Sequence, residues 1–469
     1  MIALLPFILS LAATFINIFL CVTKISKRYS INLNILFWAI IFISFFAVRS
    51  NFSNDFLIDF AVGFISLDEF SFCFGVVLSA LMIIFLISSF YSDDEKFYKQ
   101  EMFALASLAS FGLLAMSLSV ELILTLIFLE IASISIYAMI AMNSVEYKSV
   151  EAAFKYFLLS SFMSAFYLLG AAFVFGVAGS TKYSFIATGL NSDFLSIIGI
   201  ILVLSMMFFK IAIFGFYRWS IDVYYGSNLN IAGFLASAFK LASFAILIKL
   251  CFLYPGNNIE ILQGIFAILA VLSMFAGNLL SLKETNVKKI LIAAGIVHSG
   301  YIFINLSSVG ASVSIYPAIF YLSTYTIVVG FSFAILNGLF GDREIKISDL
   351  SGLYKVRPTE AFALTVICLS FIGFPYSVGF LGKLFIFFSA IESGKSYLAI
   401  FGIINTIFSV YYYLKIIISI YFSENKTALS CEDSKKFGLK LLALSSILFI
   451  LLEGSGVFSI TSFLNLFIK

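Results

Sequence analysis

Long apolar runs alternate with short polar segments along the whole chain. The pattern predicts fourteen spans, at residues 2–23, 31–48, 71–90, 102–118, 120–142, 150–177, 193–215, 229–253, 258–281, 288–309, 313–339, 360–390, 396–423 and 437–459. About 20 apolar residues allow a helix to cross a bilayer, whereas a transmembrane β-barrel needs strands of alternating character. The chain is therefore predicted to be an all-α polytopic membrane protein.

The composition excludes a soluble globular protein. Of the 469 residues, 62% are hydrophobic and only 11% are charged. In soluble domains, about 45–50% of the residues are apolar and about 25% are charged. No segment between the spans is long or polar enough to form a separate domain. Any function must therefore be carried by the helices.

The basic residues are distributed unevenly between the loops. The odd-numbered loops contain 18 lysine and arginine residues, and the even-numbered loops together with the C-terminus contain four. Because basic residues favour the cytoplasmic side of a membrane, the odd loops are expected in the cytoplasm and both termini on the opposite side, which is the periplasmic side if the membrane is a bacterial inner membrane. The net charge of +3 does not indicate nucleic acid as a partner.

The sequence lacks the usual motifs for cofactors and metals. Its five cysteines form no CxxC pair, and it contains no GxGxxG or GxxxxGK[ST] segment. We therefore expect no flavin, nucleotide, iron–sulfur cluster or metal ion on this chain.

Four ionisable residues lie deep within the predicted spans. Lys210, Lys240 and Lys383 have no acidic residue at i±3 or i±4, and Glu130 occupies the middle of the span 120–142. A charge at mid-bilayer depth costs roughly 2.5–3.5 kcal/mol, so other helices or water must satisfy the lysines. Glu130 is the natural partner of one of them. Buried groups of this kind can load and release protons near neutral pH.

Other polar residues in the spans have both structural and functional interpretations. Glu151 and Lys155 are i, i+4 on one helix face, where a local ion pair would explain them. Lys415 lies close enough to a span end for its ammonium group to reach the interface. His298, the one histidine, is either a hydrogen-bond donor in helix packing or a proton relay.

Two spans contain residues that interrupt a helix. Glycine and proline cluster in GFPYSVGFLGK, which ends at Lys383, and a polar-aromatic stretch follows Lys210. Paired interruptions in the two halves indicate an internally repeated transporter. The lysines lie five spans apart, an odd number, so the repeat is predicted to be inverted. The predicted break residues are Gly215, Gly373, Pro375, Gly379 and Gly382.

Seven motifs are distributed over most of the chain. They are LDEFS (67–71), VEAAFKYFLLSSFMSAFYLLGAAFVFG (150–176), WSIDVYYG (219–226), FLASAFKLASFAIL (234–247), GNLLSLKETNVKKILIAAGIVHSGY (277–301), DLSGL (349–353) and IGFPYSVGFLGK (372–383). Together they resemble the antiporter-like subunits of the proton-pumping NADH:quinone oxidoreductase, respiratory complex I.

The resemblance implies an architecture and a set of residue roles. It implies two inverted five-helix repeats, at 102–253 and 258–423, flanked by spans 1–3 (1–101) and span 14 (437–469), with helices 7 and 12 broken. Glu130 is expected to pair with Lys210, Lys240 to be the central lysine of span 8, and Lys383 to serve the far half-channel. Protons are expected to pass by Lys240 and the region of His298. The supporting residues are Glu151, Lys155, Tyr301 and Lys415.

Among the antiporter-like subunits, two features favour subunit N. Subunit L is expected to have a C-terminal extension beyond span 14. Subunit M is expected to carry a glutamate at the span 12 site, where this chain has Lys383. In the span 7 break the chain departs from the family, because Gly215 and Tyr217 stand where proline and histidine are usual. Glycine can still supply the break, but a tyrosine does not carry a proton near neutral pH as a histidine does.

The resemblance also implies a function and partners. The chain is expected to be a non-redox, proton-translocating subunit of an enzyme that couples quinone reduction to proton transfer. Subunits K and M are the expected neighbours in the lipid bilayer, and quinone, flavin and iron–sulfur clusters are expected elsewhere in the complex. Two alternatives stay open. One is a subunit of an Mrp-type Na⁺/H⁺ antiporter, and the other is a structural membrane scaffold.

Overall fold

The structure, a computed structural model, describes residues 4–23, 26–49, 65–91, 99–142, 147–190, 193–251, 259–308, 314–423 and 433–455. In these ranges, twelve helices are long and apolar enough to cross a membrane, and α1 and α16 are shorter apolar helices. Every predicted span corresponds to one or more helices, which confirms an all-α polytopic membrane protein. Both chain ends, which we predicted to be periplasmic, lie outside the described residues.

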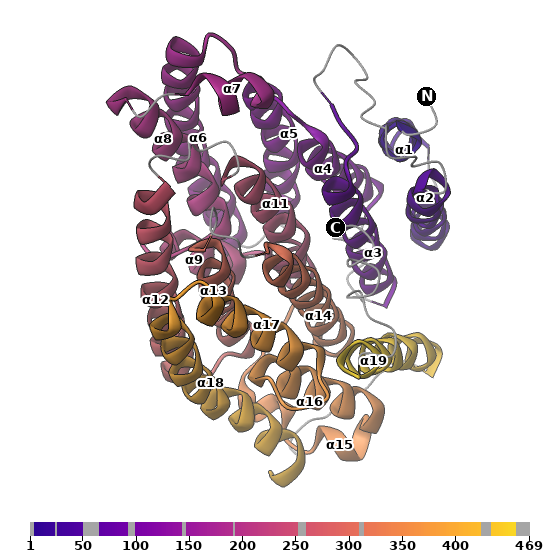
Figure 1. The fold of residues 1–469 in the computed structure, drawn as a ribbon. Coiled ribbons are helices and arrows are strands. Elements are labelled where there is room, and N and C mark those ends of the chain that lie inside the picture. Colours follow the sequence, from indigo (N-terminus) through magenta and orange to yellow (C-terminus); the bar gives the residue numbers. More distant parts are fainter. Residues whose placement is uncertain are drawn as a thin grey trace. The chain divides into compact units, whose positions relative to one another are not determined.

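The chain forms two compact units. Unit 1 comprises Met1–Phe90, Asp94–Ile211 and Asp222–Ile259. Within it, α6 packs along α8 and α5, and α4 packs along α5 and α1 (Figure 1). Its helices are α1 (Leu5–Leu20), α2 (Lys27–Arg49), α3 (Glu69–Tyr91), α4 (Gln100–Leu118), α5 (Leu122–Ala141), α6 (Tyr147–Ala178), α7 (Tyr183–Gly189), α8 (Phe194–Ile211), most of α9 (Arg218–Gly226), α10 (Leu229–Phe234), η2 (Leu235–Phe239) and α11 (Lys240–Cys251).

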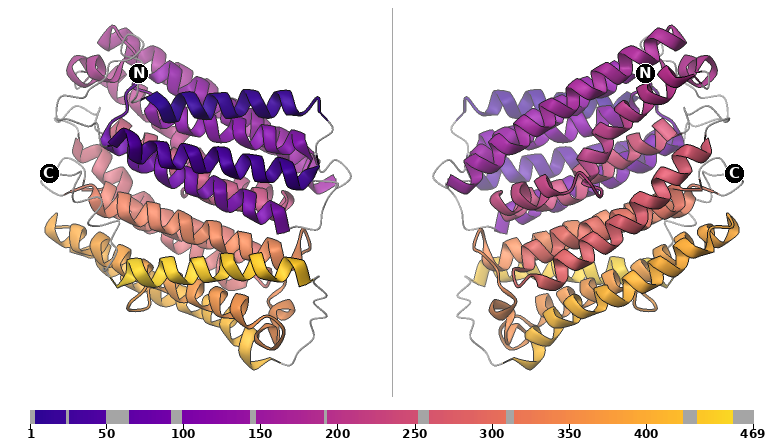
Figure 2. Two further views of the ribbon diagram at one scale, coloured as in Figure 1. Left: turned by 90° about the vertical axis from the view of Figure 1, so that its right-hand side faces the viewer. Right: turned by 90° about the vertical axis from the view of Figure 1, so that its left-hand side faces the viewer.

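Unit 2 comprises Tyr91–Asp93, Ala212–Ile221 and Glu260–Lys469. In this unit α17 contacts α13, α14, α16, α18 and α19, and α14 and α19 lie side by side (Figure 2). Its helices are α12 (Ile259–Lys283), α13 (Val287–Leu306), α14 (Tyr316–Phe340), η4 (Ile347–Leu350), α15 (Leu353–Val356), α16 (Pro358–Ile372), α17 (Val378–Glu392), α18 (Ser396–Phe422) and α19 (Asp433–Gly454). The boundaries of the two repeats stay a prediction.

Among the described residues, three isolated β-bridges each join two loops that are both even-numbered or both odd-numbered. The bridges pair Ile65 with Ser119, Glu121 with Lys182, and Asn286 with Lys346. The first two join even-numbered loops within unit 1, and the third joins odd-numbered loops within unit 2. Spans that alternate in direction bring loops together in this way.

The helix of span 7 is interrupted between α8 and α9. Gly215 has φ +89° and Ala212 has φ +61°. Both angles lie in the left-handed region, which glycine adopts freely and alanine does not. Gly215 therefore lies in this break. Ala212 is a second break residue, which the sequence analysis did not identify because alanine is a good helix former.

Span 12 is interrupted between α16 and α17. Gly373 has φ +91°, and Tyr376 has φ +65°. Ser377 then caps α17, because its side chain accepts a hydrogen bond from the backbone N–H of Phe380. Gly373 and Pro375 therefore lie in the predicted break.

Gly379 and Gly382 are inside α17 rather than in the break, which corrects the prediction. Both are sites of close approach. A Cβ atom at Gly379 would collide with the carbonyl group of Ser370, and one at Gly382 would collide with the ring of Tyr321. These glycines therefore allow α17 to pack closely on its neighbours.

Span 8 contains a π-helical turn directly before its lysine. The turn, η2, covers Leu235–Phe239, and α11 begins at Lys240. Single π-turns inside α-helices are frequent at functional sites. The apolar pattern of the span gave no sign of this turn.

Candidate functional site

Lys210 is fully buried at the C-terminal end of α8. Its ammonium group donates hydrogen bonds to Ser160 Oγ at 2.7 Å, Ser133 Oγ at 2.9 Å and Tyr156 OH at 3.4 Å. It also lies 4.7 Å from the ring centre of Tyr156 and 5.1 Å from that of Phe239. Neutral hydroxyls and aromatic rings therefore surround this charge, and α5 and α6 supply the hydroxyls.

Glu130 does not contact Lys210. Both residues are described, and they form no ion pair. Instead, Glu130 Oε1 accepts a hydrogen bond of 2.5 Å from Ser164 Oγ. The direct pair that we expected is therefore open in this structure. The reason is geometric: Ser164 lies one turn further along α6 than Ser160, and one turn of helix is about 5.4 Å.

Lys240, the first residue of α11, is also buried. The residue before it, Phe239, ends the π-helical turn and places its ring against the ammonium group of Lys210. Unit 1 therefore contains Glu130, Lys210 and Lys240, and their shared role in proton transfer stays a prediction.

Lys383 is buried in unit 2, close to the break of span 12. Its ammonium group donates to the carbonyl oxygens of Phe371 at 2.8 Å and Ile372 at 2.9 Å. These are the last two residues of α16, whose carbonyls have no helical partner because the helix ends there. The C-terminal end of a helix also carries partial negative charge. The break thus creates the binding site for this lysine.

His298, on α13, is held by tyrosines from two other helices. Its Nδ1 lies 2.6 Å from Tyr321 OH on α14, and its Nε2 lies 3.4 Å from Tyr413 OH on α18. The imidazole stacks on Tyr325 with ring centres 4.4 Å apart. It also contacts the ring of Phe371, whose carbonyl binds Lys383. Unit 2 therefore brings His298 and Lys383 together across one aromatic layer.

The supporting residues have differing surroundings. Lys155 Nζ lies 2.8 Å from Glu151 Oε1, which is the predicted local pair, and 3.4 Å from Asp222 Oδ2 on α9. Tyr301 OH lies 2.9 Å from Thr406 Oγ1, and its ring centre is 4.9 Å from Lys383 Nζ.

Lys415 is half-buried on α18, and Tyr217 is half-buried in the span 7 break. The ring of Tyr217 lies near that of Phe214, whose backbone N–H donates to Ser273 Oγ at 2.9 Å. This hydrogen bond satisfies a backbone group that the interrupted helix leaves without a helical partner.

Sequence reasoning missed several polar groups of these sites. Ser160 and Ser164 are spaced i, i+4 in SSFMS, a signal that could have indicated a common helix face, but small residues at this spacing are equally typical of helix packing. Arg357, which lies between α15 and α16, is a buried loop residue whose guanidinium is 3.8 Å from the fully buried carboxylate of Glu360.

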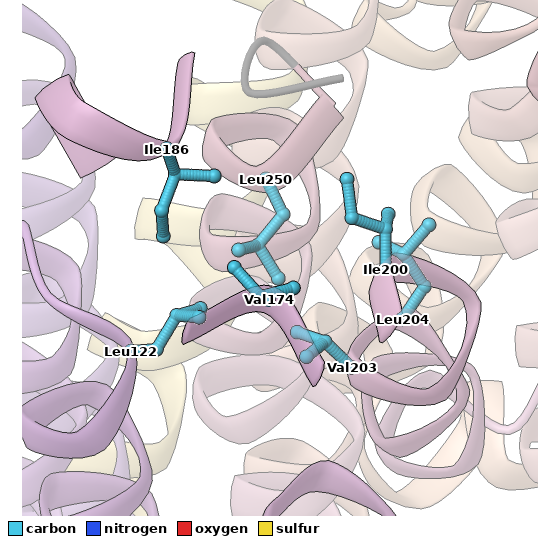
Figure 3. A pocket seen from close by; sticks show the side chains of 7 residues that line it. All are labelled: Leu122, Val174, Ile186, Ile200, Val203, Leu204 and Leu250. Carbon is cyan, nitrogen blue, oxygen red and sulfur yellow. The ribbon is translucent and has the colours of Figure 1, made fainter. Parts of the chain in front are cut away.

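A small pocket in unit 1 offers only apolar groups. It is lined by Leu122, Val174, Ile186, Ile200, Val203, Leu204 and Leu250 (Figure 3). The polar chemistry of this unit is therefore found around Lys210 and not in the pocket. Within the described ranges, no cluster of three or more His, Cys, Asp or Glu side chains could hold a metal ion. The groups that are present can bind and transfer protons.

Comparisons with known proteins identify the family. Residues 119–409 match the family described as NADH:quinone oxidoreductase/Mrp antiporter, transmembrane. The NADH-quinone oxidoreductase subunit N of Campylobacter fetus subsp. fetus is 95% identical over the full length of both chains. The subunit N of Trichlorobacter lovleyi is 34% identical, over 76% of this chain and 74% of the relative.

A solved structure shares the fold. A chain of respiratory complex I from Thermus thermophilus, with bound aureothin, matches with a TM-score of 0.81 and 25% identity, covering 96% of this chain and 98% of that one. Both relatives are N subunits of the oxidoreductase, so the Mrp alternative is not favoured. The chain therefore belongs to the NADH:quinone oxidoreductase/Mrp antiporter family and, within it, to the antiporter-like N subunits of NADH-quinone oxidoreductase.

Proposed function

We propose that this chain moves protons across the inner membrane as a non-redox part of the oxidoreductase, coupled to quinone reduction in other subunits. The observation that carries this proposal is the environment of Lys210. A fully buried ammonium group is held by neutral hydroxyls alone, while the carboxylate that could neutralise it stays one helical turn away. Such a group can gain and lose a proton when its partner moves.

The proposed cycle depends on the distance between Glu130 and Lys210. Two opposite charges about 4 Å apart attract by on the order of 4 kcal/mol at an effective dielectric constant of 20. Closing the pair therefore makes Lys210 hold its proton more tightly, and opening it favours release toward Lys240. Lys240 directly follows Phe239, whose ring contacts Lys210, so the two lysines are close along the chain of contacts.

In unit 2, His298 and Lys383 are proposed to carry the proton onward. The imidazole can accept and donate protons near neutral pH, and the surrounding phenol groups hold it in place by hydrogen bonds. Lys383, bound to the carbonyl groups at the end of α16, is proposed to exchange the proton at the far half-channel. Glu151, Lys155, Tyr301 and Lys415 are proposed as supporting residues.

The proposal extends to the surroundings of the chain. Subunits K and M would flank it in the membrane arm, both termini would face the periplasm, and the repeats would cover 102–253 and 258–423. Flavin, iron–sulfur clusters and quinone would bind to other subunits of the complex. The lysine, glutamate, histidine and hydroxyl side chains of this chain are suited to binding protons.

Purification of the tagged protein in mild detergent tests the proposal. Mass spectrometry should recover the other subunits of the oxidoreductase together with iron–sulfur clusters, and vesicles made from the preparation should pump protons when quinone is reduced. Recovery with only a few small membrane proteins, combined with a sodium-dependent pH gradient, would contradict it and assign the chain to an antiporter.

A further inference from the structure

Ser164 has two acceptors for a single hydroxyl hydrogen. Its Oγ lies 2.5 Å from Glu130 Oε1 and 2.9 Å from the backbone oxygen of Ser160. A serine hydroxyl donates one hydrogen bond at a time. Ser164 therefore has two alternative orientations, one bound to the carboxylate and one bound back to its own helix.

The four side chains around this position form two layers between α5 and α6. Glu130 and Ser164 form one layer, and Ser133 and Ser160 form the next, one helical turn closer to Lys210. Lys210 bonds both serines of its own layer. The carboxylate therefore belongs to the layer that Lys210 does not reach.

We propose that Ser164 is a positioning residue that holds Glu130 in the open arrangement, away from Lys210. The inference rests on the proposed function and deepens it, because it assigns the group that controls the pair. In the orientation bound to Glu130, the hydroxyl retains the carboxylate in its own layer. In the orientation bound to Ser160 O, the carboxylate is released and can approach Lys210.

The strength of the contact makes this control effective. A hydrogen bond to an ionised group is short and about twice as strong as a neutral one. Its loss should change the ratio of open to closed pairs roughly tenfold or more. The ammonium group keeps its hydroxyl partners in both arrangements, so its own binding site is not dismantled.

The test compares four variants in the assembled complex. Ser164→Ala removes the hydroxyl, Ser164→Thr retains it, and Ser164→Cys keeps the size of the side chain while weakening the donor. Ser161→Ala is the matched control, because Ser161 is an exposed serine on the same helix. The measurements are protons pumped per quinone reduced, and the infrared carboxylate band assigned to Glu130 by its loss in Glu130→Gln.

Ser164→Ala is expected to lower the proton yield several-fold and to shift the Glu130 band, whereas Ser164→Thr and Ser161→Ala should match the parent protein. If Ser164→Ala does not assemble, Ser164→Cys decides the question with the same two measurements. A Ser164 variant without the donor whose yield and infrared band match Ser161→Ala overturns the inference.

Lys210→Ala separates this inference from the function on which it depends. If Lys210→Ala still pumps, the proposed function fails. If Lys210→Ala does not pump and Ser164→Ala behaves like the control, only the role of Ser164 fails.

Discussion

Glu130 and Lys210 contact consecutive turns of the same helix instead of each other. Lys210 Nζ bonds Ser160 Oγ, and Ser164 Oγ bonds Glu130 Oε1, so the two charges contact serine hydroxyls on successive turns of α6. The open arrangement keeps both the buried Lys210 and the half-buried Glu130 hydrogen-bonded, which offsets the cost of removing charged groups from water. The same arrangement leaves the ion pair available for the coupling step.

Lys383→Ala should abolish coupled proton pumping while leaving the complex assembled. A group that transfers a proton typically contributes about 100-fold or more to the rate, and this substitution removes the ammonium group completely. It also leaves the carbonyl oxygens of Phe371 and Ile372 without their partner, and the buried one, that of Phe371, then costs about 1–3 kcal/mol.

Quinone reduction and proton uptake in vesicles should be measured together for this variant. Lys440→Ala, which replaces an exposed lysine of α19, is the matched control and should behave like the parent protein. Normal pumping by Lys383→Ala would show that the span 12 lysine does not carry protons.

Tyr321→Phe should impair pumping more than Tyr413→Phe. The hydroxyl of Tyr321 lies 2.6 Å from His298, and that of Tyr413 lies 3.4 Å away. Loss of a neutral hydrogen bond of normal length is worth about 0.5–1.5 kcal/mol, so a reduction of about 2- to 10-fold is expected for Tyr321→Phe. Pumping rates at fixed quinone reduction give the comparison. Equal effects, or a larger effect of Tyr413→Phe, would contradict the assignment of Tyr321 as the main partner of His298.

Ala212→Gly should stabilise the protein by about 1 kcal/mol, because glycine adopts the left-handed backbone without strain. Gly215→Ala should destabilise it by about 1–2 kcal/mol. There is open space around Gly215, so this cost is a property of the backbone alone. The midpoint of thermal unfolding in detergent measures both changes. A lower midpoint for Ala212→Gly would show that its conformation is not strained.

The spans and the deep lysines could be predicted because each depends on the local sequence. A run of apolar residues must form a helix in a membrane, and a lysine such as Lys240 interrupts that run visibly. The breaks were predicted where glycine or proline marks them, at Gly215, Gly373 and Pro375. Ala212 could not be identified, because alanine is a good helix former and does not mark a left-handed position in the sequence.

The arrangement of the polar groups could not be predicted in the same way. Ser133 and Ser160 meet Lys210 only because α5, α6 and α8 pack together, and no local signal distinguishes them from serines that pack against helices. The open state of the pair with Glu130 follows from this packing. Likewise, the tyrosines around His298 come from helices that are separate in the sequence.

Proton pumping by the assembled complex carrying Lys210→Ala tests the central claim most directly. Assembly is checked first by the recovery of the other subunits, with Lys440→Ala as the control. We predict that the variant complex assembles, that its pumping falls at least about 100-fold, and that Lys440→Ala pumps normally. An assembled Lys210→Ala complex that pumps as many protons per quinone as the parent would contradict the account.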